Sequence, residues 1–75
     1  MSTTATTEID RLASLLHETA DRHHSFEAAA PPHDWWDWYA AYMPARQSGS
    51  SPDEAAESAA RYMAEVKGVR PEAAA

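Results

Sequence analysis

The chain has 75 residues, with twelve acidic residues against six basic ones, a formal net charge of −6, no cysteine and only two glycines. A chain of this length forms one domain with a small core, and without cysteine it has neither disulfides nor thiolate metal sites to stabilise that core. The acidic balance excludes nucleic-acid binding, because phosphates need a basic surface, and it disfavours an anionic membrane surface. No apolar run has the roughly 20 residues of a transmembrane helix, and the polar N-terminus does not resemble a signal peptide. We therefore expect a cytoplasmic protein that binds neither nucleic acid nor membranes.

The pattern of helix-forming and helix-breaking residues predicts an all-α fold of three helices. Alanine, glutamate and arginine are spread through the chain, both glycines follow helix-forming stretches, and no alternation of apolar and polar residues indicates a strand. The expected organisation is a three-helix domain over residues 7–68, with disordered ends at 1–6 and 69–75.

The first helix is expected over residues 7–26, with Thr7 as its N-cap. Apolar side chains recur at helical spacing. They predict a buried face made of Ile9, Leu12, Leu16, Ala20 and His23, with Leu15 and Phe26 on its flanks. Thr19 belongs to the same side, where its hydroxyl can bond back to the carbonyl of Leu15. The two prolines of "AAAPPHD" end the helix because they cannot continue it.

The second helix, expected over residues 34–47, contains "WWDWYAAY", the densest aromatic stretch of the chain. Helical geometry predicts a central face made of Trp35, Tyr39, Tyr42 and Met43. Trp36 and Trp38 should lie on opposite flanks, and Pro44 on the far side, where solvent tolerates a bend. The arc of aromatics is too wide for one neighbouring helix to cover. Three interpretations stay open: a plain core, an interface with a second copy or a partner protein, or a pocket for a flat aromatic small molecule.

The third helix has the clearest start signal, because "SPDE" combines an N-cap, a proline at the first helical position and a capping-box glutamate. We expect this helix over residues 52–67, with Ser51 as the N-cap and Gly68 as a left-handed C-cap. Its inner face is predicted to consist of Ala55, Ala59, Tyr62, Met63 and Val66. Small alanines there would suit the large side chains of the second helix.

One group of chemically active side chains is expected where the first helix meets the second. His23 falls on the predicted apolar face, Glu27 lies one turn further on, and His33 follows the double proline. These groups could form a hydrogen-bonded corner in which Glu27 accepts from the imidazoles. They could also hold the polar end of a ligand. The candidate ligand-binding residues are His23, Glu27, His33, Trp35, Trp36 and Tyr39.

A metal site is the alternative interpretation of this group, with His23, Glu27 and His33 as a two-histidine, one-carboxylate set that leaves open positions. We assign no catalytic residue and no cofactor from the sequence. No nucleophile motif, glycine-rich phosphate loop or paired-carboxylate motif supports another kind of enzyme.

The stretch "HHSFEAAAPPHDWWDWYAAYMPARQSGSSPDEAAESAARYM" resembles a helical segment that follows the main domain in actinobacterial glyoxalase or bleomycin-resistance-like proteins. The resemblance spans residues 10–67, and "HDWWDWYAAYM" and "SPDEAA" are its most specific parts. It implies a free-standing form of a unit that serves docking, oligomerisation or the covering of a pocket. The chain has no room for the β-rich metal-binding domain of that superfamily, so neither its metal ligands nor its activities are implied.

Two functional hypotheses follow. The first is a small acidic helical module that uses the aromatic face of the second helix to self-associate, to dock on a partner enzyme or to bind a ligand. The second is a small metal-dependent or acid–base enzyme with its site at His23, Glu27 and His33, beside the tryptophans. The size of the chain favours the first, and we expect a homodimer or an obligate complex with a partner protein, because so small a core leaves aromatic surface uncovered.

Overall fold

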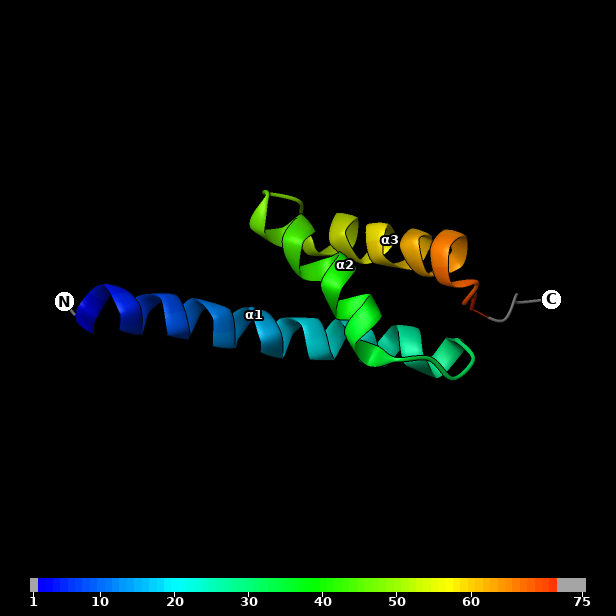
Figure 1. Cartoon of the computed structure of the whole chain (residues 1–75), viewed down its shortest axis with the longest axis horizontal. Coiled ribbons are helices and arrows are strands. Elements are labelled where there is room, and N and C mark those ends of the chain that lie inside the picture. The colour runs from blue at the N-terminus through cyan, green and yellow to red at the C-terminus, as the bar shows by residue number, and fades with distance from the viewer. Residues whose placement is uncertain (1, 72–75) are drawn as a thin grey trace.

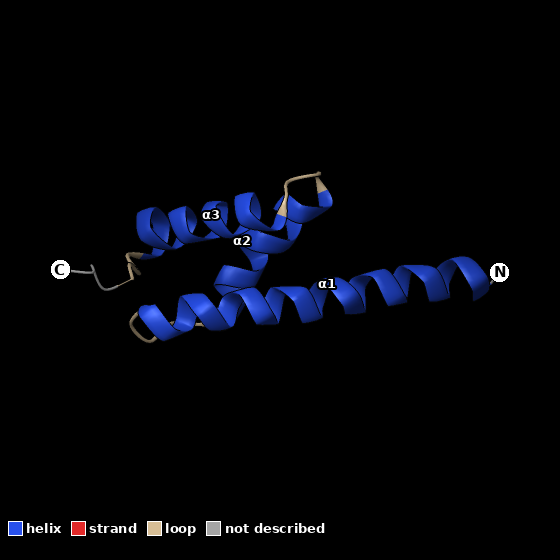
Figure 2. Ribbon diagram, turned by 180° about the vertical axis from the view of Figure 1, so that it is seen from behind, coloured by secondary structure: helices blue, strands red, loops and turns tan. Residues whose placement is uncertain are grey.

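The computed structural model describes residues 2–71 of the chain, with side chains from residue 6 onward. The described residues form an all-α fold without strands, made of three helices joined by two short loops (Figures 1 and 2). The helices are α1 (Ser2–Ala29), α2 (Trp35–Gln47) and α3 (Pro52–Tyr62), and α3 continues into a π-helical turn, η1 (Met63–Lys67). The predicted fold class is therefore confirmed.

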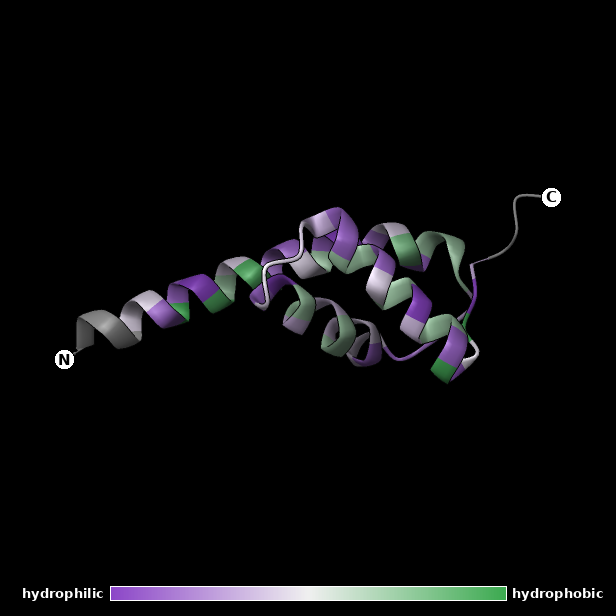
Figure 3. Cartoon of the chain, turned by 90° about the horizontal axis from the view of Figure 1, so that it is seen from above, coloured by the Kyte–Doolittle hydropathy of each residue, from purple (hydrophilic) through white to green (hydrophobic). Residues whose placement is uncertain are grey.

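Helix α1 is longer than predicted at both ends. It begins at Ser2, so Thr7 lies inside the helix and residues 2–6, expected to be disordered, are helical; Met1 lies outside the described residues. No proline or glycine interrupts residues 2–29, and the helix ends just before Pro31. Helices α2 and α3 lie beside the C-terminal half of α1 only, and its N-terminal half projects beyond them (Figures 1 and 3).

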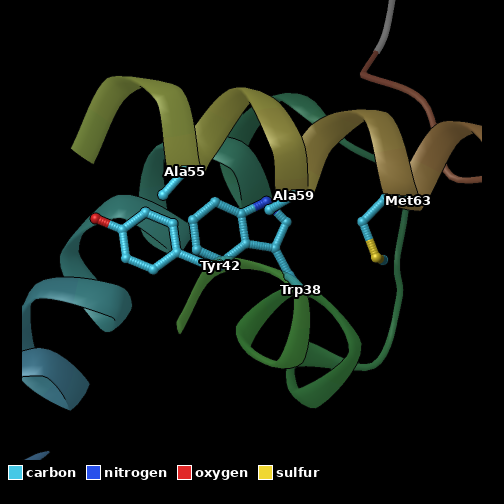
Figure 4. Close-up of a cluster of buried hydrophobic side chains, with 5 residues drawn as sticks. All are labelled: Trp38, Tyr42, Ala55, Ala59 and Met63. Carbon is cyan, nitrogen blue, oxygen red and sulfur yellow. The ribbon is translucent and has the colours of Figure 1, made fainter. Parts of the chain in front are cut away.

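The core lies between α2 and α3. Its members are at most 1 % exposed: Trp38, Tyr42, Ala55, Ala59 and Met63. The rings of Trp38 and Tyr42 stack with their centroids 4.9 Å apart beneath the alanines of α3 (Figure 4). Large side chains of α2 thus pack against small ones of α3, as the sequence predicts.

The buried face of α2 differs from the predicted one. Trp38, expected on a flank, is in the core, whereas Trp35, expected at the centre, is 52 % exposed and Trp36 is 53 % exposed. Tyr39 and Met43 are half-buried at the edge of the core. The neighbouring helices cover only part of the aromatic arc, and they cover the part centred on Trp38 and Tyr42.

Helix α3 begins as predicted. The Ser51 hydroxyl accepts from the Glu54 amide at 3.1 Å, and the Glu54 carboxylate accepts from the Ser51 amide at 2.8 Å, which completes the capping box. At the other end Gly68 adopts a left-handed φ of 70°, the predicted C-cap. Pro44 lies inside α2 on its exposed side, also as predicted.

The end of the α3 segment departs from the prediction in two ways. Val66, expected on the inner face, is 64 % exposed, because the π turn η1 holds more residues per turn than an α-helix and rotates Val66 outward. Val69, expected in a disordered tail, packs against the core, and its amide donates to the Met63 carbonyl at 2.8 Å. Residues 72–75 of that predicted tail lie outside the described residues.

Helix α1 buries a different face from the one predicted. Thr19 and His23 are buried, and the Thr19 hydroxyl donates to the Leu15 carbonyl at 2.6 Å, as expected. The apolar residues at the centre of the predicted face are exposed: Ile9 by 66 %, Leu12 by 46 % and Leu16 by 43 %, with Ala20 also exposed. The face that meets α2 lies about 70° further around the helix axis. The first turns of α1 project beyond α2 and α3 (Figure 3).

Candidate functional site

The two histidines of the predicted group bond to one another. Nε2 of His23 lies 2.8 Å from Nε2 of His33, and Nδ1 of His33 lies 2.8 Å from the Pro31 carbonyl oxygen. The carbonyl can only accept, so Nδ1 of His33 carries a hydrogen. When both rings are neutral, Nε2 of His33 must accept from Nε2–H of His23, which leaves Nδ1 of His23 as an acceptor.

His23 is the buried member of this pair, at 5 % exposure, as its predicted place on the inner face requires. Burial lowers the pKa of His23, and the negative charge of Glu27 opposes this effect without cancelling it. His23 is therefore a neutral hydrogen-bonding group that fixes the corner between α1 and the start of α2.

Glu27 is not the hydrogen-bond acceptor for the two imidazoles that the sequence predicts. Its side chain is exposed and accepts no hydrogen bond from either imidazole or from a described indole. The prediction that Glu27 is the common acceptor is wrong, because the double proline brings His33 directly to His23 and the two rings satisfy one another. The Glu27 carboxylate is left facing solvent at the rim of a pocket.

This pocket, here called the α1–α2 pocket, has a volume of about 510 Å³. It is open to solvent, and it is lined by Leu16, Ala20, His23, His24, Glu27, Trp35 and Tyr39. Four of the six predicted ligand-binding residues, His23, Glu27, Trp35 and Tyr39, therefore surround one pocket. The other two lie next to it: His33 contacts His23, and Trp36 contacts Trp35.

A chain of ring contacts connects the pocket to the core. Trp35 meets Tyr39 edge-to-face at 4.8 Å between centroids, and Tyr39 meets His23 at 5.6 Å. His23 in turn lies 5.4 Å from the buried ring of Trp38. The aromatic wall is thus held in a fixed orientation by packed rings rather than by a loop.

The geometry does not support the metal alternative at His23, Glu27 and His33. Within residues 2–71, no three histidine or acidic side chains are grouped as a metal ion requires. Two ligand atoms on one zinc ion, each about 2.0–2.1 Å from the metal, lie more than 3 Å apart. The Nε2 atoms of His23 and His33, at 2.8 Å, are instead at hydrogen-bond distance.

The sequence did not reveal the strongest polar cluster, which joins α1 to α2. Arg46 donates twice to the carboxylate of Glu18, from Nε at 2.7 Å and from Nη2 at 3.1 Å, and once to the Ser50 carbonyl at 2.9 Å. The hydroxyl of Tyr42 donates to the same carboxylate. These bonds, Arg46 first, lower the pKa of Glu18 to about 2, and burial together with Glu18 raises the pKa of Tyr42 to about 12.

Glu18 could not be assigned to this role because the predicted apolar face pointed it into solvent. A weak signal did exist: Tyr42 and Arg46 are one helical turn apart, and a buried tyrosine hydroxyl needs a partner. The cluster holds the two helices together and faces away from the α1–α2 pocket, with which it shares no residue.

The remaining notable surface is a group of exposed apolar side chains, here called the exposed strip. It consists of Ile9, Leu12, Leu16, Trp35 and Trp36. Leu16 and Trp35 line the same pocket, and Trp36 packs on Trp35 at 5.5 Å between centroids, so the strip runs continuously from α1 to the start of α2. Exposed apolar surface that is contiguous in this way marks interaction sites.

Comparisons with protein-family models, curated proteins and solved structures find no match for this chain. The resemblance to the helical segment of glyoxalase-like proteins therefore stays a prediction. None of the helices in the described part of the chain combines the length and apolar character that a membrane span requires.

Proposed function

We propose that this protein is a non-enzymatic self-association module in which two copies bind through the exposed strip. The observation that carries the proposal is the strip itself, which lies partly on a helical segment that projects from the folded body (Figure 3). Two large exposed apolar side chains, Ile9 and Leu12, lie on the N-terminal half of α1; Leu12 lines a shallow pocket together with Gln47 at the end of α2.

The spacing on α1 suits a second copy. Ile9, Leu12 and Leu16 are separated by three and four residues, the spacing of the seam in a two-helix coiled coil. In an antiparallel two-fold pair, Leu12 would meet its own equivalent near the axis, and Ile9 would lie opposite Leu16 of the other copy. Such a face is complementary to itself, as a two-fold interface requires.

The charges of α1 also permit this pairing, although each copy carries a net charge of −6. Of the four charged residues between residues 6 and 20, only Glu8 falls beside the strip on a helical wheel. Asp10, Arg11 and Glu18 lie more than about 100° away from it. Like charges would therefore stay apart when the strips meet.

The size of the strip predicts a weak dimer. Each of the five side chains is between 43 and 66 % exposed, which corresponds to roughly 100 Å² each for side chains of this size. Two strips together would bury about 1,000 Å², the lower end of specific protein–protein interfaces. We therefore expect a dissociation constant in the micromolar range.

Sedimentation equilibrium tests the proposal across about 1 µM to 1 mM protein, which spans the expected affinity. We expect a monomer–dimer equilibrium for the wild type and a monomer for Leu12→Glu, which places two carboxylates against one another at the axis. Val66→Glu is the control, because Val66 is also an exposed apolar side chain, at 64 % against 46 % for Leu12, but lies outside the strip. Circular dichroism tests whether each variant is folded.

A wild-type monomer over the whole range would refute self-association. If that monomer then binds a protein of different sequence through the same residues, the strip is a docking face for a partner and not for a second copy. A dimer that Leu12→Glu and Val66→Glu weaken equally would also contradict the proposal, because it would place the interface elsewhere.

A further inference from the structure

We propose that the α1–α2 pocket binds a small aromatic amine in its cationic form. This inference goes beyond self-association, since it concerns a small-molecule ligand and rests on polar groups that lie outside the exposed strip. Leu16 and Trp35 belong to both the strip and the pocket, so a ligand and a second copy would compete for them. Its volume of about 510 Å³ lies in the range of small-molecule sites.

The hydrogen-bonding groups of the pocket call for a ligand that donates. The Pro31 carbonyl orients His33, and His33 orients His23, so that the free ring nitrogen of His23, Nδ1, is an acceptor. The Glu27 carboxylate at the rim can only accept. An ammonium group supplies several N–H donors to these two acceptors. A carboxylate or phosphate would be repelled by Glu27 and would find donors only on His24, Trp35 and Tyr39.

The charges around the pocket favour the same ligand. No lysine or arginine lines it, and Glu27 is the one acidic side chain among its lining residues. Four basic residues of the described chain are paired with acidic residues elsewhere: Arg22 with Asp53, Arg46 with Glu18, Arg61 with Glu57, and Lys67 with Asp37. The carboxylate of Glu27 forms no such pair, so it is available to a bound cation.

The aromatic side chains of the pocket favour a ligand that also carries a flat ring. Trp35 and Tyr39 stand at 69° to one another, so a flat ring can lie against one of them while the other presents its edge. A cation near the face of an indole or phenol ring is further stabilised by the ring quadrupole. Leu16 and Ala20 complete an apolar wall on α1.

Calorimetric titration with three compounds of the same shape tests the charge requirement: 2-phenylethylammonium, 2-phenylethanol and phenylacetate. For a ligand of this size we expect the ammonium compound to bind with a dissociation constant on the order of 0.1–1 mM, and the alcohol and the carboxylate to bind at least tenfold more weakly. Amide-correlated NMR then locates the ligand, with the largest shift at the indole N–H of Trp35.

Two matched pairs of variants locate the site. Glu27→Gln should weaken binding of 2-phenylethylammonium about tenfold, and Glu65→Gln, at an exposed residue of η1, should leave it unchanged. Trp35→Ala should abolish binding, while Trp36→Ala should largely preserve it, because Trp36 is equally exposed but does not line the pocket. The Glu27 side chain makes no hydrogen bond with the described residues, so Glu27→Gln should fold normally.

The proposal is overturned if 2-phenylethylammonium does not bind at 10 mM, if the three compounds bind equally, or if Glu27→Gln and Glu65→Gln behave alike. Leu12→Glu separates it from the proposed self-association, because Leu12 does not line the pocket. That variant should lose dimerisation and still bind the ammonium compound, and Glu27→Gln should do the reverse.

Discussion

The contact between α1 and α2 rests on Glu18, and replacing it by glutamine should destabilise the protein measurably. Glutamine keeps the shape of the side chain but removes the charge that receives two bonds from Arg46 and one from Tyr42. A carboxyl whose pKa falls from 4.5 to about 2 on folding stabilises the folded state by at most about 3 kcal/mol. The Glu18 side chain is 29 % exposed, so solvent screening reduces this to about 1–2 kcal/mol.

The pH dependence follows from the same shift. Because the pKa of Glu18 is lowered on folding, its contribution is fully present above the unfolded pKa of 4.5 and is lost as the pH falls towards about 2. The difference in the free energy of unfolding between wild type and Glu18→Gln should therefore be constant near neutral pH. It should shrink between pH 4.5 and pH 2.

Urea unfolding monitored by far-ultraviolet circular dichroism at pH 7 and at pH 3 measures both effects. In thermal unfolding at neutral pH, the melting temperature of the variant should be roughly 5–15 °C below that of the wild type. Glu65→Gln is the control, because Glu65 is exposed and forms no ion pair with the described residues. Equal stability of the two variants at pH 7, or a difference that persists unchanged at pH 3, would refute the role assigned to Glu18.

Three further substitutions or titrations probe other parts of the fold. Ser51→Ala should cost about 1 kcal/mol, because it removes the hydroxyl that caps α3; an unchanged melting temperature would contradict the capping box. His23 should titrate below pH 6.5 in NMR, since burial lowers its pKa, and the protein should lose stability as the pH falls below 6.5; an ordinary titration would exclude the buried pair. Ala59→Leu should lower the free energy of unfolding by about 1–3 kcal/mol, measured by urea unfolding, because Ala59 is fully buried in the cluster that contains Trp38. An unchanged free energy would contradict close packing of the core around Ala59.

Local signals in the sequence predicted the helices well. The capping box at Ser51, the left-handed position at Gly68 and the proline pair after α1 act within a few residues, and each lies where the sequence placed it. The Thr19 bond to the Leu15 carbonyl is of the same local kind. Such features depend on neighbouring backbone groups and need no knowledge of the tertiary arrangement.

The faces of the helices were harder to predict, because they depend on where the neighbouring helices lie. A helical wheel ranks Ile9, Leu12 and Leu16 as core, but the neighbouring helices leave each of them at least 43 % exposed, and Thr19 is buried in their place. The Glu18 cluster depends on the crossing of α1 and α2, which the sequence does not specify. The candidate site fell between these cases: His23 was placed correctly, while its bonding partner was His33 and not Glu27.

The projecting half of α1 has a thermodynamic consequence. Neither α2 nor α3 lies alongside its first turns, and isolated helical segments shorter than about 12–15 residues are only marginally stable in water. Amide hydrogens there should exchange with solvent faster than those beside the buried Thr19 and His23. Any partner that covers this segment would stabilise its helical turns on binding, so helix ordering and association would be coupled. Such an event releases heat at the expense of entropy, so the proposed self-association should weaken on warming at temperatures well below the melting of the rest of the protein.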